Sequence, residues 1–318
     1  MVKTKIVLDC DPGHDDALAM MLAHGSDRID LLAITTVSGN QTLAKVTHNA
    51  RVVATVMGLT GVPIAAGSDR PLVGPALHSF DIHGETGLDG PPPLTPTVPE
   101  ADEPGVDLLI RTVMDSAPGE ITLVATGPAT NLATALAREP AIAARVRSVV
   151  MMGGSFTRGN ITPAAEFNVY ADPQAAAAVL GASWDVTVIG LDLTHQATAT
   201  PDVISRIAGI GSAPGRFAAD LLDFFTASYE QAQGMPAPPV HDACAVAYLI
   251  DPSLIETRPA HVEVELTGEH TTGMTVIDFG EGSGPRNRTV GVTLDRTRFW
   301  DLMVDSIAAL PGPVRARV

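Results

Sequence analysis

The chain has 318 residues, of which 45% are hydrophobic and 18% are charged, a composition that excludes general disorder and allows one large domain or two small ones. Its formal net charge is −16, from 36 acidic and 20 basic residues, which disfavours binding to a phosphate backbone or to an anionic membrane surface. We therefore expect no nucleic-acid partner and no membrane association.

The chain carries no pattern of a secreted or membrane-spanning protein. Its two cysteines are too few for a disulfide framework, and no run of about 18 apolar residues could cross a membrane. The first ten residues hold one short apolar run and no signal-peptide core. These features favour a cytoplasmic protein.

Short apolar segments alternate with helical segments over much of the chain. In chain order we expect a strand at 5–9, a helix at 15–23, a strand at 31–37, a helix at 42–57, strands at 63–66 and 121–125, a helix at 131–138, a strand at 146–152, a helix at 173–180, a strand at 186–191 and a helix at 217–233. This alternation is typical of a mostly parallel sheet with helices on both faces.

The remaining segments fit the same architecture. Residues 67–105, 153–162 and 234–240 are predicted as loops, the first and last of them rich in Pro and Gly, while residues 261–294 alternate as antiparallel edge strands do. No internal repeat or linker divides the chain. We predict one α/β domain over residues 1–318: an open, mostly parallel twisted sheet flanked by helices, a Rossmann-like core, with extra antiparallel edge strands.

An acidic cluster follows the first predicted strand. Asp9 and Asp11 stand two residues apart at its end and share a face, and Asp15 and Asp16 open the next helix, where the helix dipole favours negative charge. Ligands of open α/β sheets bind beyond the carboxyl ends of the strands, so we expect four carboxylates to converge there. A divalent cation such as Ca²⁺ or Mg²⁺ would relieve their repulsion. A single Asp could simply cap the helix, but the whole cluster favours a cation site.

Residues 9–16 (DCDPGHDD) resemble the amino-terminal signature of the inosine–uridine-preferring nucleoside hydrolases. Further stretches match that family in the same order, at residues 34–44, 64–67, 82–87, 122–132, 151–154, 165–168, 190–197 and 240–248, so the resemblance runs from about residue 3 to residue 300. Members cleave the N-glycosidic bond of ribonucleosides to ribose and free base and hold Ca²⁺. The resemblance implies a ribonucleoside substrate such as inosine or uridine, one Ca²⁺ per subunit, and a homo-oligomer, either a tetramer or a dimer.

The resemblance also implies a cation site and two catalytic groups. Carboxylates of Asp11, Asp16 and Asp242 and the carbonyl of Thr126 would bind Ca²⁺. Asp11 would be the general base for a Ca²⁺-bound water, and His241, with an ordinary pKa near 6.5, the acid for the leaving base. Without the resemblance, Thr126 reads equally well as a turn residue and Asp242 as a helix cap.

Around the nucleoside, the resemblance places Asp15, Asn40, His83, Met152, Asn160, Glu166, Phe167, Asn168, Tyr229 and His241. Amide and carboxylate groups suit ribose hydroxyls because they donate or accept as each hydroxyl requires. Tyr229 is expected to stack on the base, or else to pack on a helix face. Residues 231–234 (QAQG) lack the basic or aromatic residue that relatives often carry there, so the base preference stays open. The pattern assigns no role to His14 and a packed thiol to Cys10.

Three alternatives remain beside this prediction. A haloacid-dehalogenase-like phosphatase also has Asp-x-Asp at a strand end, but the following Pro12-Gly13 and the charge of −16 disfavour it. A Ca²⁺-dependent nucleoside-binding protein without turnover would need the same pocket but no general base or acid, and the presence of both Asp11 and His241 argues against it. A hydrolase restricted to pyrimidine nucleosides is the third, and His241 favours purine competence instead.

Overall fold

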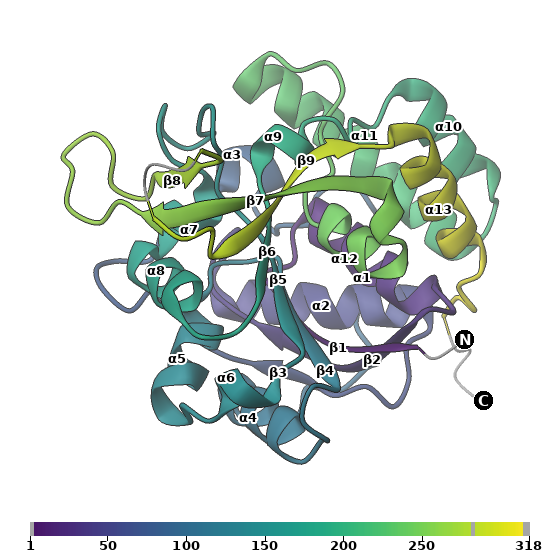
Figure 1. Cartoon of the computed structure of the whole chain (residues 1–318). Coiled ribbons are helices and arrows are strands. Elements are labelled where there is room, and N and C mark those ends of the chain that lie inside the picture. Colours follow the sequence, from purple (N-terminus) through teal and green to yellow (C-terminus); the bar gives the residue numbers. More distant parts are fainter. Residues whose placement is uncertain (1–2, 281–283, 314–318) are drawn as a thin grey trace.

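The computed structural model describes residues 3–280 and 284–313 (Figure 1). Within these residues the strands form a nine-stranded sheet in the order β3-β2-β1-β4-β5-β6-β9-β7-β8. Their bounds are β1 Thr4–Cys10, β2 Ile29–Thr36, β3 Ile64–Ala66, β4 Ile121–Ala125, β5 Ser148–Met152, β6 Val186–Ile189, β7 Ile255–Val264, β8 Thr275–Asp278 and β9 Arg288–Leu294. The run from β3 to β9 is parallel, and β7 pairs antiparallel with both β9 and β8. The predicted mostly parallel α/β sheet with antiparallel edge strands is confirmed.

The structure adds two details to the predicted sheet edge. The antiparallel part begins at Ile255, before residue 261, and β9 pairs antiparallel with β7, as expected, but parallel with β6 on its other side. Alternation of polar and apolar residues reports that one face of a strand is solvated and does not report the direction of its neighbour. Strand direction here follows from the chain path: β7 and β8 form the outer edge, and β9 returns between β7 and β6.

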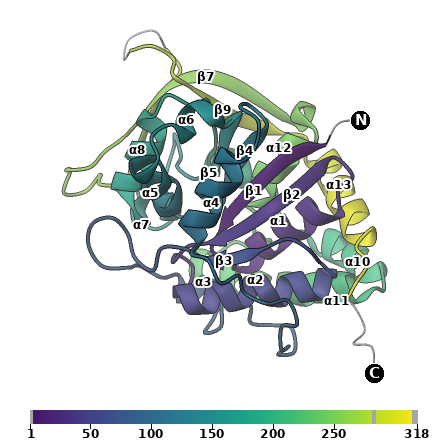
Figure 2. The ribbon, with the colours of Figure 1, turned by 90° about the horizontal axis from the view of Figure 1, so that it is seen from below.

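Helices cover both faces of the sheet. Their bounds are α1 His14–Gly25, α2 Leu43–Met57, α3 Phe80–His83, α4 Gly105–Met114, α5 Thr130–Arg138, α6 Ile142–Arg145, α7 Phe167–Ala171, α8 Pro173–Gly181, α9 Leu191–Thr194, α10 Pro201–Gly209, α11 Ala213–Gln233, α12 Ala243–Ile250 and α13 Arg296–Ala308, with a 3₁₀ turn η1 at Pro252–Leu254. Figure 2 shows α4, α5 and α8 on one side of the sheet and α1, α2 and α13 on the other. Alternate residues of β1 accordingly enter different cores, Ile6 and Leu8 on the α1 side and Val7 on the α4 side. The short helix α3 lies inside a segment predicted as loop.

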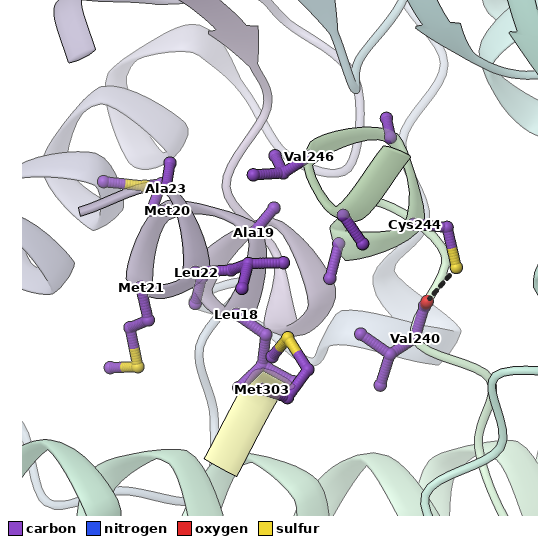
Figure 3. Packing of buried hydrophobic residues seen from close by; sticks show 14 of the residues in the cluster. Leu18, Ala19, Met20, Met21, Leu22, Ala23, Val240, Cys244, Val246 and Met303 are labelled. Carbon is purple, nitrogen blue, oxygen red and sulfur yellow. Dashed lines mark hydrogen bonds between the residues drawn. The ribbon is translucent and has the colours of Figure 1, made fainter. Parts of the chain in front are cut away.

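The core on the α1 side is dense with small and flexible side chains. Around α1, Ala19 and Leu22 pack near Val246 of α12 and Met303 of α13 (Figure 3). Cys244 Sγ lies 3.4 Å from the carbonyl oxygen of Val240, so this thiol is a packed core group. Close packing of this kind holds the start of α1 rigidly against the sheet.

Cys10 is a packed thiol, as predicted. It is fully buried at the end of β1, with Sγ 3.7 Å from the carbonyl oxygen of Thr35. No helix in the described ranges has both the length and the apolar character that a membrane span requires.

Candidate active site

Asp11 directly follows β1 and lies in a cradle that only glycine neighbours permit. Its Oδ2 accepts a hydrogen bond from the backbone N–H of Asn40 at 2.6 Å. A Cβ at Gly39 would lie 2.1 Å from that oxygen, and one at Gly127 would lie 2.6 Å from Oδ1. The buried Oδ1 has no hydrogen-bond partner among the described residues. The fold thus holds this carboxylate through Oδ2 and leaves Oδ1 able to bind a further group.

Three more carboxylates gather next to it. Oxygens of Asp15, Asp16 and Asp242 lie within 4.8 Å of one another, and all three side chains are buried. At the start of α1, Asp16 accepts hydrogen bonds from the Gly13 N–H at 3.1 Å and the Thr126 hydroxyl at 2.9 Å. Burial, followed by the charge of Asp16, raises the pKa of Asp15 to about 7. Burial and the neighbouring carboxylates raise the pKa of Asp242 well above its usual range.

Asp9 does not belong to this group, so the expectation that four signature carboxylates converge is wrong for Asp9. Its Oδ1 accepts hydrogen bonds from the Thr35 hydroxyl at 2.5 Å and the Asn131 amide at 2.7 Å. Burial raises the pKa of Asp9 to about 7. The side chain is held between β1, β2 and α5, and the residue after the strand, Asp11, reaches the site instead.

The donor set fits a hard divalent cation. Every ligand candidate is an oxygen: the carboxylates of Asp11, Asp16 and Asp242 and the carbonyl of Thr126, with Asp15 grouped closely by the structure. Carboxylate and carbonyl oxygens without nitrogen or sulfur suit Ca²⁺ or Mg²⁺. Burial, followed by the charges of neighbouring carboxylates, raises the pKa values of Asp11, Asp15 and Asp242, and a cation bound there would supply the missing positive charge.

A cavity of about 230 Å³ opens beside these carboxylates. All ten residues predicted to surround a nucleoside line it: Asp15, Asn40, His83, Met152, Asn160, Glu166, Phe167, Asn168, Tyr229 and His241. Thr126 and Asp242 line it as well, whereas Asp11 and Asp16 do not. The wall also contains residues that were not predicted to bind the nucleoside: His78, Ser79, Asp81, Ile82, Ile161, Ala232 and Gln233. The signal in the sequence that could have found them is that each lies in, or next to, one of the predicted loops at 67–105, 153–162 and 234–240.

One wall of the cavity is a polar network at the start of α7. Glu166 accepts hydrogen bonds from the N–H groups of Gly154 at 2.9 Å, Asn168 at 2.9 Å and Val169 at 3.2 Å. Burial outweighs these bonds and raises the pKa of Glu166 to about 7. The Asn168 amide donates to the Thr126 carbonyl oxygen at 2.7 Å. The network holds a carboxylate and an amide side by side at the cavity.

The facing wall holds His241 between two hydroxyl groups. Its Nδ1 lies 2.7 Å from Thr194 Oγ1 and its Nε2 lies 2.9 Å from the Tyr229 hydroxyl. Burial, with a smaller contribution from His195, lowers the pKa of His241 to about 3, so the ring is neutral near pH 7. The Tyr229 ring packs edge-on against Phe225, with centroids 4.8 Å apart. Tyr229 is therefore both a packing residue and a hydrogen-bond partner of His241 at the cavity.

The structure also locates His14, to which the sequence pattern assigned no role. Its ring stacks on Phe225 with centroids 5.0 Å apart and on Phe224 with centroids 5.2 Å apart. The Nε2 atom lies 2.8 Å from the carbonyl oxygen of Asp89, and Nδ1 lies 3.2 Å from Nδ1 of His83. Burial lowers the pKa of His14 to about 4. His14 thus stands directly behind a residue of the cavity wall.

Comparison with known proteins gives consistent matches over nearly the whole chain. The model of the family described as "Inosine-uridine preferring nucleoside hydrolase" matches residues 6–301. A protein of that name from Crithidia fasciculata is 50% identical over 311 residues, which are 97% of this chain and 99% of the relative. A pyrimidine-specific ribonucleoside hydrolase of Escherichia coli is 43% identical over 310 residues, 96% of this chain and 98% of the relative.

Solved structures agree with these matches. A plant nucleoside hydrolase superimposes with a TM-score of 0.90 at 31% identity, covering 96% of this chain and 99% of that one. A purine-preferring ribonucleoside hydrolase from Gardnerella vaginalis also gives 0.90, at 32% identity, covering 96% of this chain and 98% of that one. The similarity thus extends to the arrangement of the elements that carry the cavity.

Proposed function

The chain belongs to the inosine-uridine preferring nucleoside hydrolase family, whose members are N-glycosyl hydrolases, and we propose that it cleaves ribonucleosides such as inosine and uridine to ribose and free base. The observation that carries this proposal is the cavity, in which buried carboxylates stand beside amide groups that suit ribose hydroxyls. The continuous sheet supports a single domain. By resemblance to the family, the active form would be a homo-oligomer, a dimer or tetramer.

The bound cation is proposed to be one Ca²⁺ per subunit, held by Asp11, Asp16, Asp242 and the carbonyl of Thr126. The all-oxygen donor set and the raised carboxylate pKa values support this assignment. A cation at this place would acidify a coordinated water and help to hold it for attack. Asp15, whose Oδ2 accepts the His241 N–H at 3.3 Å, would bind a ribose hydroxyl.

Asp11 has the geometry of a general base. The Asn40 N–H holds its Oδ2, while Oδ1 has no partner among the described residues and can accept a proton from an attacking water. Cleavage of the bond to the base leaves positive charge on the sugar, as in other glycoside hydrolysis. The neighbouring carboxylates stabilise that charge, so Asp15 and Glu166 would bind the transition state better than the substrate.

His241 and Tyr229 are the proposed source of the proton for the leaving base. The ring is neutral and has a hydroxyl at each nitrogen, so a proton on Nε2 is shared with the Tyr229 oxygen. The ring would first take up a second proton from water on the nitrogen that lacks one and become an imidazolium. Its Nε2 proton then passes to the Tyr229 oxygen as the Tyr229 hydroxyl gives its own proton to the leaving base, and the ring returns to its neutral form. Because the pKa of the ring is low, the imidazolium releases this proton readily.

Ribose release from inosine and from uridine tests the proposal, on purified protein before and after metal stripping. Release that disappears on stripping and returns with Ca²⁺ is expected. Release from uridine alone would establish the pyrimidine-restricted alternative, and tight nucleoside binding without product would establish the binding-protein alternative. Phosphate release from a generic ester with no ribose release would favour the phosphatase.

A further inference from the structure

Behind the cavity wall, three polar groups from distant segments form a chain that ends at His83. It runs from the Asp89 carbonyl oxygen to His14 Nε2 at 2.8 Å, and from His14 Nδ1 to His83 Nδ1 at 3.2 Å. His83 lines the cavity, and its Nε2 has no hydrogen bond among the described residues. A Cβ at Gly13 would lie 2.4 Å from His83 Nδ1, so the glycine makes room for this contact.

The carbonyl at one end determines where the protons lie. A carbonyl oxygen can only accept, so a contact of 2.8 Å requires a proton on His14 Nε2. The His14 ring is buried and stacks on Phe224 and Phe225, an environment that favours a neutral ring, which leaves Nδ1 without a proton. His83 Nδ1 must then carry a proton and donate it, because two lone pairs facing each other at 3.2 Å would repel.

A second assignment of the protons on the two rings is conceivable but less favourable. The backbone N–H of His14 lies 3.3 Å from His83 Nδ1 and could donate to it if that nitrogen carried no proton. His14 Nδ1 would then have to donate as well, which leaves bare Nε2 facing the Asp89 carbonyl oxygen at 2.8 Å. The contact to Asp89 is the shortest of the three, at 2.8 Å against 3.2 Å and 3.3 Å, and it therefore decides against this arrangement.

We propose that His14 is a positioning residue that fixes the tautomer of His83, with the proton on Nδ1 and the bare Nε2 presented to the cavity as an acceptor for a hydroxyl of the bound ribonucleoside. The part that concerns the ligand rests on the proposed function. The tautomer assignment rests only on the contacts of His14, His83 and Asp89. Because the ring is held in the tautomer that accepts at Nε2, the binding affinity is not reduced by a population of the other tautomer.

Neutron diffraction from the deuterated, ligand-free full chain tests the tautomer directly. Deuterium is expected on His14 Nε2 and on His83 Nδ1, with none on His83 Nε2. Deuterium on His83 Nε2 would overturn the proposal. The expected pattern together with no ribose release from any nucleoside would support the tautomer assignment while refuting the proposed function, so the two failures are distinguishable.

Kinetics test whether His14 acts through His83. His14→Phe keeps the stacking on Phe224 and Phe225 but offers no acceptor, so KM is expected to rise about threefold to tenfold, the worth of one hydrogen bond, with kcat nearly unchanged. In a His83→Gln background the same substitution should change KM no further. Equal effects of His14→Phe in both backgrounds would show that the ring acts by packing alone and would overturn the proposal.

His14→Asn is the matched variant, because its Oδ1 can stand near the place of Nδ1 and accept from His83. It removes more of the stacked ring than Phe does, so its melting temperature should fall further while its KM stays within about twofold of the parent. A KM that follows melting temperature across the two variants would contradict a tautomer role. If His14→Asn folds poorly, the effect of His14→Phe in the two backgrounds still tests the proposal.

Discussion

Replacing Glu166 with Gln tests the electrostatics of the cavity wall through stability. The carboxylate is buried and accepts three backbone N–H bonds, from Gly154, Asn168 and Val169. Gln has the same shape but turns one oxygen into an NH₂ group, which faces backbone donors. That mismatch destabilises the variant by about 1–3 kcal/mol at every pH. The titration of Glu166 adds a pH-dependent contribution to the free energy of unfolding of the parent, and the pH dependence of the difference between parent and variant isolates it.

Burial raises the pKa of Glu166 from 4.5 to about 7 in the folded chain. The folded protein therefore holds a proton between these values that the unfolded chain has released, so stability falls as pH rises through this window. At about 1.4 kcal/mol for each pH unit, the parent should lose about 3 kcal/mol between pH 5 and pH 8 from this group. The Gln variant has no such loss.

Urea unfolding with a chelator present, at half-unit steps from pH 5 to pH 8, measures the difference between parent and variant. The advantage of the parent is expected to shrink by about 3 kcal/mol across the range, and above pH 7 it should be constant. Glu269→Gln, at an exposed position, is the control and should show a flat difference. A flat difference for Glu166→Gln too would refute the reasoning that burial dominates at this carboxylate.

Three further predictions concern catalysis and the cation. Asp11→Asn should fold and lose turnover at least about a hundredfold, since it removes the base; near-normal ribose release would exclude that role. His241→Ala should slow inosine far more than an aryl riboside whose leaving group needs no proton; equal losses would argue against an acid at this position. Ca²⁺ at a hundredfold excess over its Kd should stabilise the stripped protein by about 2.7 kcal/mol, seen as a higher Tm, and Asp242→Asn should abolish the gain. An unchanged Tm in the parent would contradict the cation site.

Much of the fold follows from local pattern. The apolar run of β1, the acidic start of α1 and the long helix α11 lie close to where the sequence predicts them. Each records the burial of its own residues, which is a local property. The direction of β9 and the short helix α3 do not follow from such patterns, since both depend on what the chain meets elsewhere.

The same distinction between local pattern and tertiary structure applies to the site. The residue types at the strand ends indicate an oxygen-rich cation site and a polar pocket, because carboxylates cannot gather in a buried place without compensation. Which carboxylates meet is a matter of tertiary structure: Asp242 reaches Asp15 from more than 220 positions away, while Asp9, inside the signature, is held by Thr35 and Asn131.

His14 shows the boundary most clearly. In the sequence it is one more titratable side chain, between Gly13 and Asp15 of the acidic cluster. In the fold its two nitrogens meet Asp89 and His83, which lie 75 and 69 residues further along the chain. The composition and spacing of residues determined which chemistry the chain can carry. Only the packing of distant segments decided which atoms face one another, because a hydrogen bond depends on positions in space that no local pattern records.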